Sequence, residues 1–369
     1  MLMELGFFTQ PVHAIGRDYA ETLHEDRDIF VLADALGYTE AHCGEHIFDL
    51  VETVPNSLMF VAWLAGQTKQ IKLGTGVHNL AFSHPAVVAS NVAMVDTMLQ
   101  GRFLFGIGAG VSRADAEGLG LLDADRNAMF EEAIEHILAL WQGNAPYNIT
   151  GKFWNISTER AGWPELGIGA MVKPFQRPHP PILAASGDPR SSRVPGFGRR
   201  GWSMMSSDIV PASRLAEHWS GYAKGCEEAG READRDSWRV VRAILVADDD
   251  RTAEAYGRSD PRSPYREHFH HFHKKLTKGR ALGVFKDDPA MPDEDVTLDF
   301  ALDQCVITGS VNSVVDQILA LREASGGFGK LIYAGKDWVD PGLSRRSMEL
   351  MAEKVMPAVN AAIGASRAA

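Results

Sequence analysis

Glu45 and His46 are adjacent side chains whose types suggest chemistry. They end residues 39–46, a short segment that we predict to be a strand. A histidine beside a carboxylate can serve as a general base, because its pKa lies near neutral pH. A rim histidine that only hydrogen-bonds the next loop would leave the same two letters in the sequence. Position alone therefore leaves a catalytic and a structural role equally open for this pair.

Two glycine-rich segments stand at the ends of later predicted strands. Residues 74–80 read Gly-Thr-Gly-Val-His-Asn-Leu, and residues 106–110 read Gly-Ile-Gly-Ala-Gly. Glycine at a strand end lets a ligand approach the backbone, although a β-bulge is the commoner explanation. The second segment begins like a dinucleotide-binding fingerprint but lacks the third spaced glycine. Neither segment identifies a cofactor by itself.

A third candidate segment, residues 186–192, reads Ser-Gly-Asp-Pro-Arg-Ser-Ser and runs into a predicted helix. Hydroxyl groups, backbone N–H groups and a guanidinium at such a place are suited to binding a phosphate. A serine that only caps the helix is the alternative. The candidate phosphate ligands are Ser186, Gly187, Arg190, Ser191 and Ser192.

The sequence predicts no metal site. Four histidines are close together, at His268, His270, His271 and His273. No flanking acid suits a set of ligands with them, so we expect a solvated or pocket-facing helix. Three cysteines are spread along the chain, at Cys43, Cys226 and Cys305. They form no CxxC pair, which argues against a zinc site or a disulfide framework and favours a reducing, cytoplasmic location.

Predicted strands and helices alternate along the chain and must position these segments. The strands are residues 4–10, 39–46, 71–80, 102–108, 181–186, 202–206, 238–247 and 330–334. The helices are residues 22–36, 57–68, 85–99, 126–141, 191–200, 212–229, 311–324 and 344–363. Such alternation favours parallel strands, and eight units are the number of a closed (β/α)8 TIM barrel. Functional side chains of this fold lie at the C-terminal strand ends, where all three candidate segments stand.

Two insertions interrupt the alternation within what we expect to be one domain, residues 1–369. Residues 146–180, after the fourth strand, are rich in glycine, proline and aromatic residues, and predict a hairpin around residues 150–152. Residues 256–299, after the seventh strand, are charged and rich in histidine. A long segment at this end of a barrel is either a mobile lid or a disordered loop.

Charge and hydropathy exclude some classes of partner. The formal net charge is −11, whereas binding of nucleic acid needs a basic face. No stretch approaches the roughly 20 apolar residues of a membrane span, and no signal peptide is evident at the N-terminus. We therefore expect neither a nucleic-acid partner nor a membrane.

Several short segments, taken in their order along the chain, resemble the bacterial luciferase-like (class C) flavin monooxygenases. They are residues 6–8, 44–46, 54–56, 67–75, 84–85, 101–108, 151–154, 200–201 and 307–310. The resemblance covers nearly the whole chain, and is nearest to members that act on limonene and cyclic ketones. It implies a (β/α)8 barrel, reduced FMN (FMNH2) as cofactor and molecular oxygen (O2) as co-substrate. It also implies a separate NAD(P)H:flavin reductase and a homodimer.

The resemblance further implies the kind of reaction. One oxygen atom would enter a hydrophobic small molecule, such as a terpene, a cyclic ketone or a polyketide-like compound, through a flavin hydroperoxide shielded from water. Hydroxylation, epoxidation and Baeyer–Villiger insertion all remain open. A deazaflavin-dependent dehydrogenase on the same barrel and a non-catalytic flavin-binding partner subunit are the alternatives.

Individual residues acquire roles from the resemblance. His46 matches the active-site histidine, and Gly76-Val77 matches a cis peptide bond beneath the flavin ring. Gly108 and Ala109 stand where luciferase has a cysteine and an arginine beside the flavin. Arg190 or Arg193 would then supply the phosphate contact of that arginine, together with Ser191 and Ser192. The substrate pocket would be lined by Phe8, His78 and Met205.

Overall fold

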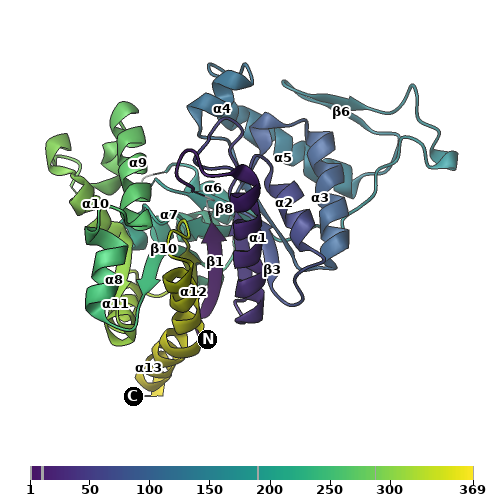
Figure 1. Ribbon diagram of the computed structural model, residues 1–369. Helices are drawn as coiled ribbons and strands as arrows, with labels where there is room; N and C mark the ends of the chain where they lie inside the picture. Colours follow the sequence, from purple (N-terminus) through teal and green to yellow (C-terminus); the bar gives the residue numbers. More distant parts are fainter. Residues whose placement is uncertain (1, 10–11, 189–190, 287, 369) are drawn as a thin grey trace. The chain divides into compact units, whose positions relative to one another are not determined.

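The computed structural model describes residues 2–9, 12–188, 191–286 and 288–368 (Figure 1). Arg190, one of the predicted phosphate ligands, lies outside the described residues.

Among the described residues, eight parallel strands close into a barrel, which confirms the predicted fold class. They are β1 (Glu4–Thr9), β2 (Glu40–Cys43), β3 (Lys72–Thr75), β5 (Phe103–Gly108), β8 (Ile182–Ser186), β9 (Ser203–Ser206), β10 (Arg239–Val246) and β12 (Lys330–Ala334). Their order is β10-β12-β1-β2-β3-β5-β8-β9, and β10 also pairs with β9. Every residue of β10 is buried, as expected for a parallel strand covered on both faces.

The helices begin where the sequence supplies a cap. α3 (Pro85–Leu99) and α11 (Val311–Ala324) have their predicted bounds. α3 has proline in its first turn. α1 (Tyr19–Ala35) starts three residues before the predicted start at 22, because Asp18 caps it by accepting from the backbone N–H of Glu21. The other barrel helices are α2 (Ser57–Leu64), α5 (Arg126–Gln142), α6 (Val194–Arg200), α7 (Leu215–Glu228), α12 (Pro341–Leu350) and α13 (Met356–Ala368). None of the helices that the described residues form is long and apolar enough to cross a membrane.

The contacts between residues divide the chain into two compact units. The first comprises Met1–Ala41 and Ala184–Ala369, and the second comprises His42–Leu183. In the first unit, Phe7 of β1 packs edge-on against Phe30 of α1 and stacks on Tyr333 of β12. In the second unit, Phe105 of β5 packs edge-on against Trp141 of α5. Each unit therefore joins its strands to its helices through aromatic contacts.

The first predicted insertion contains the expected hairpin, which belongs to the second unit. β6 (Asn148–Thr150) pairs antiparallel with β7 (Asn155–Ser157), and the hairpin projects from the helices of its unit in Figure 1. The Glu132 carboxylate accepts hydrogen bonds from the backbone N–H groups of residues 152–154 at 2.7–2.8 Å. A Cβ on Gly151 would lie 2.2 Å from Glu132 Oε1, so this turn requires glycine. Residues 151–154 therefore have a structural role.

The second predicted insertion is helical and belongs to the first unit. It contains α9 (Pro264–Lys278) and α10 (Leu298–Cys305). Both helices contribute to a buried cluster with β10, whose members include Tyr265, Phe269, Phe285, Leu302 and Val306. Because the described residues of this segment are folded and packed, the disordered-loop alternative is wrong. The role of a lid stays a prediction.

Candidate active site

His46 follows β2 and is held between two carboxylates of the second unit. Its Nδ1 lies 3.0 Å from Asp115 Oδ2, and its Nε2 lies 3.1 Å from Glu52 Oε2. The backbone N–H of His46 also donates to the carbonyl of Val54. The neighbouring carboxylate in the sequence, Glu45, has different partners. The carboxylates that pair with His46 are thus Glu52, six residues on, and Asp115, 69 residues on, rather than its sequence neighbour Glu45.

The charge of His46 follows from this environment. Burial disfavours the charged imidazolium, but the two carboxylates outweigh burial and raise the pKa of His46 to about 10. Burial also opposes ionisation of Asp115, yet its hydrogen bond to His46 holds the pKa of that carboxyl below its usual value. At neutral pH His46 is therefore a cation without a lone pair to accept a proton. The geometry supports a charge-stabilising or proton-donating group rather than the general base first expected.

Asp115 is fixed independently of His46. It lies in the short helix α4 (Arg113–Gly118), where its N–H donates to the Oγ of Ser112. Its Oδ1 accepts from the backbone N–H groups of Ile47 and Phe48, at 3.1 and 2.8 Å. Asp115 therefore binds both the ring of His46 and the backbone just after it. The sequence shows only a serine cap followed by an acid, a common helix start, so it did not reveal this partner.

The segment after β3 bends sharply at the predicted position. The strand expected at residues 71–80 is divided into β3 and β4 (His78–Asn79), and the Gly76–Val77 peptide bond is cis, as the resemblance implied. The N–H of Gly76 donates to the carbonyl of Cys43 at 2.7 Å. His78 and Asn79 pair in register with Ile107 and Gly108 of β5. The structure thus brings the candidates of this segment and Gly108 together within the second unit.

Gly108 is required by Val77, which lies between β3 and β4. A Cβ at this position would lie 2.4 Å from Cγ2 of Val77, which is too close for any side chain. Ala109, next in the chain, is buried and uncharged. Residue 109 therefore cannot make the phosphate contact that the arginine of luciferase makes at this position, as the sequence indicated.

The remaining candidates belong to the first unit. Phe8 of β1 and Met205 of β9 are buried. In the predicted phosphate segment, α6 begins at Val194 rather than at 191, and the N–H of Arg193 donates to Ser191 Oγ at 3.4 Å. Ser192 is exposed, and neither its hydroxyl nor its N–H bonds another described residue. The hydroxyl and N–H of Ser192 are thus open donors, which are chemically suited to a phosphate.

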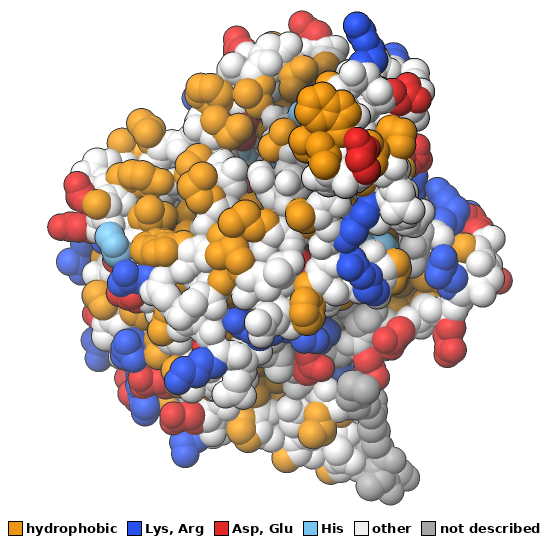
Figure 2. Space-filling view, turned by 90° about the vertical axis from the view of Figure 1, so that its right-hand side faces the viewer, with side chains coloured by type: hydrophobic (Ala, Val, Ile, Leu, Met, Phe, Trp, Pro, Cys, Tyr) orange, Lys and Arg blue, Asp and Glu red, His pale blue; other side chains and the backbone are white. Residues whose placement is uncertain are grey.

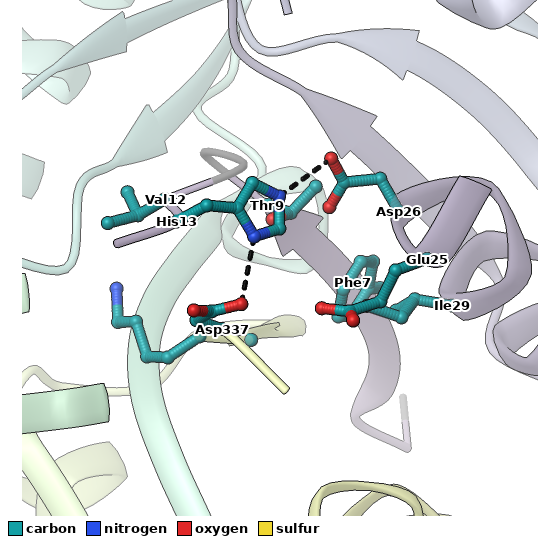
Figure 3. A pocket seen from close by; sticks show the side chains of 10 residues that line it. Phe7, Thr9, Val12, His13, Glu25, Asp26, Ile29 and Asp337 are labelled. Atoms are coloured by element: carbon teal, nitrogen blue, oxygen red, sulfur yellow. Dashed lines mark hydrogen bonds and ion pairs between the residues drawn. The ribbon is translucent and has the colours of Figure 1, made fainter. Parts of the chain in front are cut away.

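A second charged cluster, in the first unit, surrounds a small pocket (Figure 3). His13 Nδ1 lies 2.8 Å from Asp337 Oδ1, and His13 Nε2 lies 3.2 Å from Asp26 Oδ2. Atoms of His13, Glu25 and Asp337 are close enough to hold a metal ion. However, Arg17 already pairs with both Glu25 and Asp337. The pocket has a volume of about 10 Å³, far below the roughly 300 Å³ at the lower end of ligand pockets.

The clustered histidines of α9 do not converge. His268 Nε2 lies 4.0 Å from Asp208 Oδ2, which also binds the Nζ of Lys336 at 3.1 Å. His273 Nε2 lies 2.5 Å from the carbonyl of Val296. Among the described residues, no group with metal-ligand spacing includes these histidines.

Comparisons with known proteins all find similarity to monooxygenases. A family model described as "Luciferase-like monooxygenase" matches residues 3–327. Limonene 1,2-monooxygenase of Rhodococcus erythropolis is 30% identical over 98% of this chain and 88% of its own length. The solved oxygenating constituent of 3,6-diketocamphane monooxygenase of Pseudomonas putida, in complex with FMN, is 27% identical. It covers 97% of this chain and 99% of its own, with a TM-score of 0.86.

A more distant structure shares only the fold. The coenzyme F420-dependent tetrahydromethanopterin reductase of Methanopyrus kandleri is 18% identical, with a TM-score of 0.68, and covers 97% of this chain and 99% of its own.

Proposed function

Because the chain belongs to the luciferase-like monooxygenase family, we propose that it uses reduced FMN and O2 to insert one oxygen atom into a hydrophobic small molecule. A terpene, a cyclic ketone or a polyketide-like compound is the proposed substrate. The observation that carries the proposal is the pairing of His46 with Asp115 in the unit that contains the cis Gly76–Val77 bond. Similarity to monooxygenases named for limonene and diketocamphane supports it.

Reduced FMN, when bound, would supply the electrons that activate O2. We propose that Gly76, Val77, Gly108 and Ala109 contact its ring, because small or backbone groups permit close approach there. Ser186, Gly187, Arg190, Ser191 and Ser192 would bind its phosphate through hydroxyl, amide and guanidinium donors. The substrate would contact Phe8, His78 and Met205, of which the two apolar side chains exclude water.

His46 is the proposed catalytic residue. As an imidazolium it stabilises negative charge that develops on oxygen. Its Nε2 lies 3.1 Å from Glu52 Oε2, so the Nε2 proton reaches a substrate only when this contact with Glu52 is given up. Asp115 keeps the ring in one orientation through Nδ1.

The reduced cofactor must come from elsewhere, so we propose an NAD(P)H:flavin reductase as the partner, bound transiently or acting through free flavin. Support comes from the solved relative, which is the oxygenating constituent of its monooxygenase. A deazaflavin-dependent dehydrogenase is less favoured, because the F420-dependent relative is similar in fold alone. A non-catalytic partner subunit is also less favoured, because this chain retains His46 with its carboxylates.

One experiment separates these functions. The purified protein is supplied with FMN, NADH, a flavin reductase and 18O2, and is screened against terpenes and cyclic ketones by mass spectrometry. We expect a product with one added 18O atom, and none with His46→Ala. Reduction of a deazaflavin by an alcohol, without oxygen uptake or any oxygenated product, would overturn the proposal.

The homodimer remains part of the proposal and has a candidate surface in the second unit. α2 carries no charged side chain, and the only one in α3 is the buried Asp96. Their exposed apolar side chains are Met59, Trp63, Val87, Met94 and Met98. Figure 2 views the side on which α3 is drawn in Figure 1 and shows hydrophobic side chains grouped there. An uncharged helix face of this kind is typical of an interface, and a second copy meets it without repulsion between like charges.

The dimer is tested by sedimentation. Met59→Lys together with Met94→Lys places four like charges across the proposed two-fold interface, so we expect a monomer. Val339→Lys, which changes an exposed apolar residue of the first unit, should leave the mass of the wild type. A dimer that survives the double substitution would show that this surface is not the interface.

A further inference from the structure

Glu45 is a buried carboxylate of the second unit that has no part in the proposed catalysis by His46. Its Oε2 accepts from the N–H and the hydroxyl of Ser57, at 2.9 and 2.6 Å. The same oxygen lies 2.9 Å from His78 Nδ1. Its Oε1 accepts from the backbone N–H of Asn79 at 2.8 Å. One side chain therefore ties the end of β2 to the start of α2 and to β4.

The N–H and hydroxyl of Ser57 and the N–H of Asn79 all donate to Glu45. Only an ionised carboxylate accepts hydrogen bonds at both oxygens from all of them. Burial opposes ionisation, but His78, Ser57 and Asn79 outweigh it and lower the pKa of Glu45 to about 2. An ionised carboxylate cannot donate, so the proton of a neutral His78 ring must lie on Nδ1. A glutamine has the same shape, but its amide N–H₂ would face one of these donors.

The contacts of Glu45 extend to the proposed flavin-binding residues. Asn79, which binds Glu45, follows Val77 by two residues and pairs in register with Gly108. The position of a Cβ on Gly108 lies 2.4 Å from Val77 Cγ2 and 3.5 Å from Asn79 Oδ1. These residues are so closely packed that a shift of β4 must move Val77 relative to Gly108.

We infer that Glu45 is a positioning residue, whose contacts with Ser57, His78 and Asn79 hold Gly76, Val77 and Gly108 in the arrangement that binds the flavin ring. The inference rests on the proposed function, because it assumes that these residues contact a flavin. A purely structural Glu45 would stabilise the fold without affecting ring binding in the folded protein.

The test compares two glutamates of the second unit. Glu45→Gln and Glu132→Gln each remove a carboxylate that accepts several hydrogen bonds, but Glu132 acts at the hairpin. Anaerobic titrations measure the affinity of each folded variant for reduced FMN and for reduced riboflavin, which lacks the phosphate. We expect Glu45→Gln to weaken both ligands by about tenfold or more, the range for losing hydrogen bonds to a charged group. Glu132→Gln should bind both like the wild type, even though its unfolding temperature falls.

Two further variants keep the result interpretable. Ser57→Ala removes one donor to Glu45 and should weaken both ligands by a smaller factor, so it replaces Glu45→Gln if that variant does not fold. Ser192→Ala should weaken FMN but not riboflavin. Unchanged affinities in Glu45→Gln or Ser57→Ala, or a loss confined to FMN, would overturn the inference.

Failure of the proposed function gives a different result. A wild-type protein that binds neither reduced FMN nor reduced riboflavin contradicts the function and the positioning role together. Nitrogen-15 NMR of the histidine rings then still tests the contacts of Glu45. The contact with Glu45 requires Nδ1 of His78 to carry a proton in the wild type, and an unprotonated Nδ1 at neutral pH would contradict it.

Discussion

Two histidines, one in each unit, are held between two carboxylates, and the difference between them is informative. His46 lies between Asp115 and Glu52, and its side chain is 17% exposed. His13 lies between Asp26 and Asp337, and its side chain is 3% exposed. In both cases burial opposes the charged ring and the carboxylates outweigh it, so the pKa rises to about 10 for His46 and about 9 for His13.

The surroundings distinguish the two. Around His13, Arg17 neutralises Asp337 and Glu25, so the cluster forms a closed chain of charges that links α1 to the loop after β12. His46 is more accessible and belongs to the unit that contains the cis Gly76–Val77 bond and the glycine-rich end of β5. A histidine between two acids is therefore not by itself a sign of catalysis, and access to a ligand decides its role.

The largest expected difference is in catalysis. His46→Gln should lower the rate of product formation by about 10²–10⁴-fold, the usual contribution of a proton-transferring group. His13→Gln, assayed per folded molecule at low temperature, should retain the wild-type rate within about threefold, because the rate depends on no group of that cluster. Steady-state kinetics with the oxygenated substrate measure both. Equal losses of rate in the two variants would show that the two histidines between carboxylates do not differ in function.

The order is reversed for stability. His13→Leu leaves Asp26 and Asp337 without their shared cation in a nearly inaccessible place, and should cost about 3–5 kcal/mol in the free energy of unfolding. His46→Leu should cost less, because water can partly solvate the carboxylates that it exposes. Urea denaturation at pH 7 gives both values. A larger loss of unfolding free energy at His46 would show that His46, rather than His13, has the mainly structural role.

Local patterns were sufficient to predict the fold but not the partners in the site. Alternating apolar runs of strand and helix period predicted eight units, because these periods are local properties of the chain. The sequence left the role of Glu45 open, and the structure gives Glu45 and His46 different partners although they are neighbours in the chain. Of the two partners of His46, Asp115 is 69 residues away, and a contact over that distance leaves no signal in a single sequence.

The family resemblance added what local patterns could not. It located the cis bond at Gly76–Val77, which glycine alone does not indicate. It also included residues 151–154, which the contacts of Glu132 show to be structural. The helix expected from 191 begins at Val194 instead.

The smallest expected effect is on the pH dependence of stability, and it isolates His13. Its folded pKa of about 9 lies above the unfolded value of 6.5, so its contribution is full below about pH 6.5 and is lost as the pH rises through 9. The loss is at most about 3 kcal/mol, from 1.36 kcal/mol per unit. His46 acts in the same direction, but its window extends to about pH 10. The difference in unfolding free energy between wild type and His13→Gln should therefore shrink between pH 6.5 and 9.5. A difference that stays constant across that range would mean that His13 is neutral in the folded protein, and that its carboxylates are held by Arg17 alone.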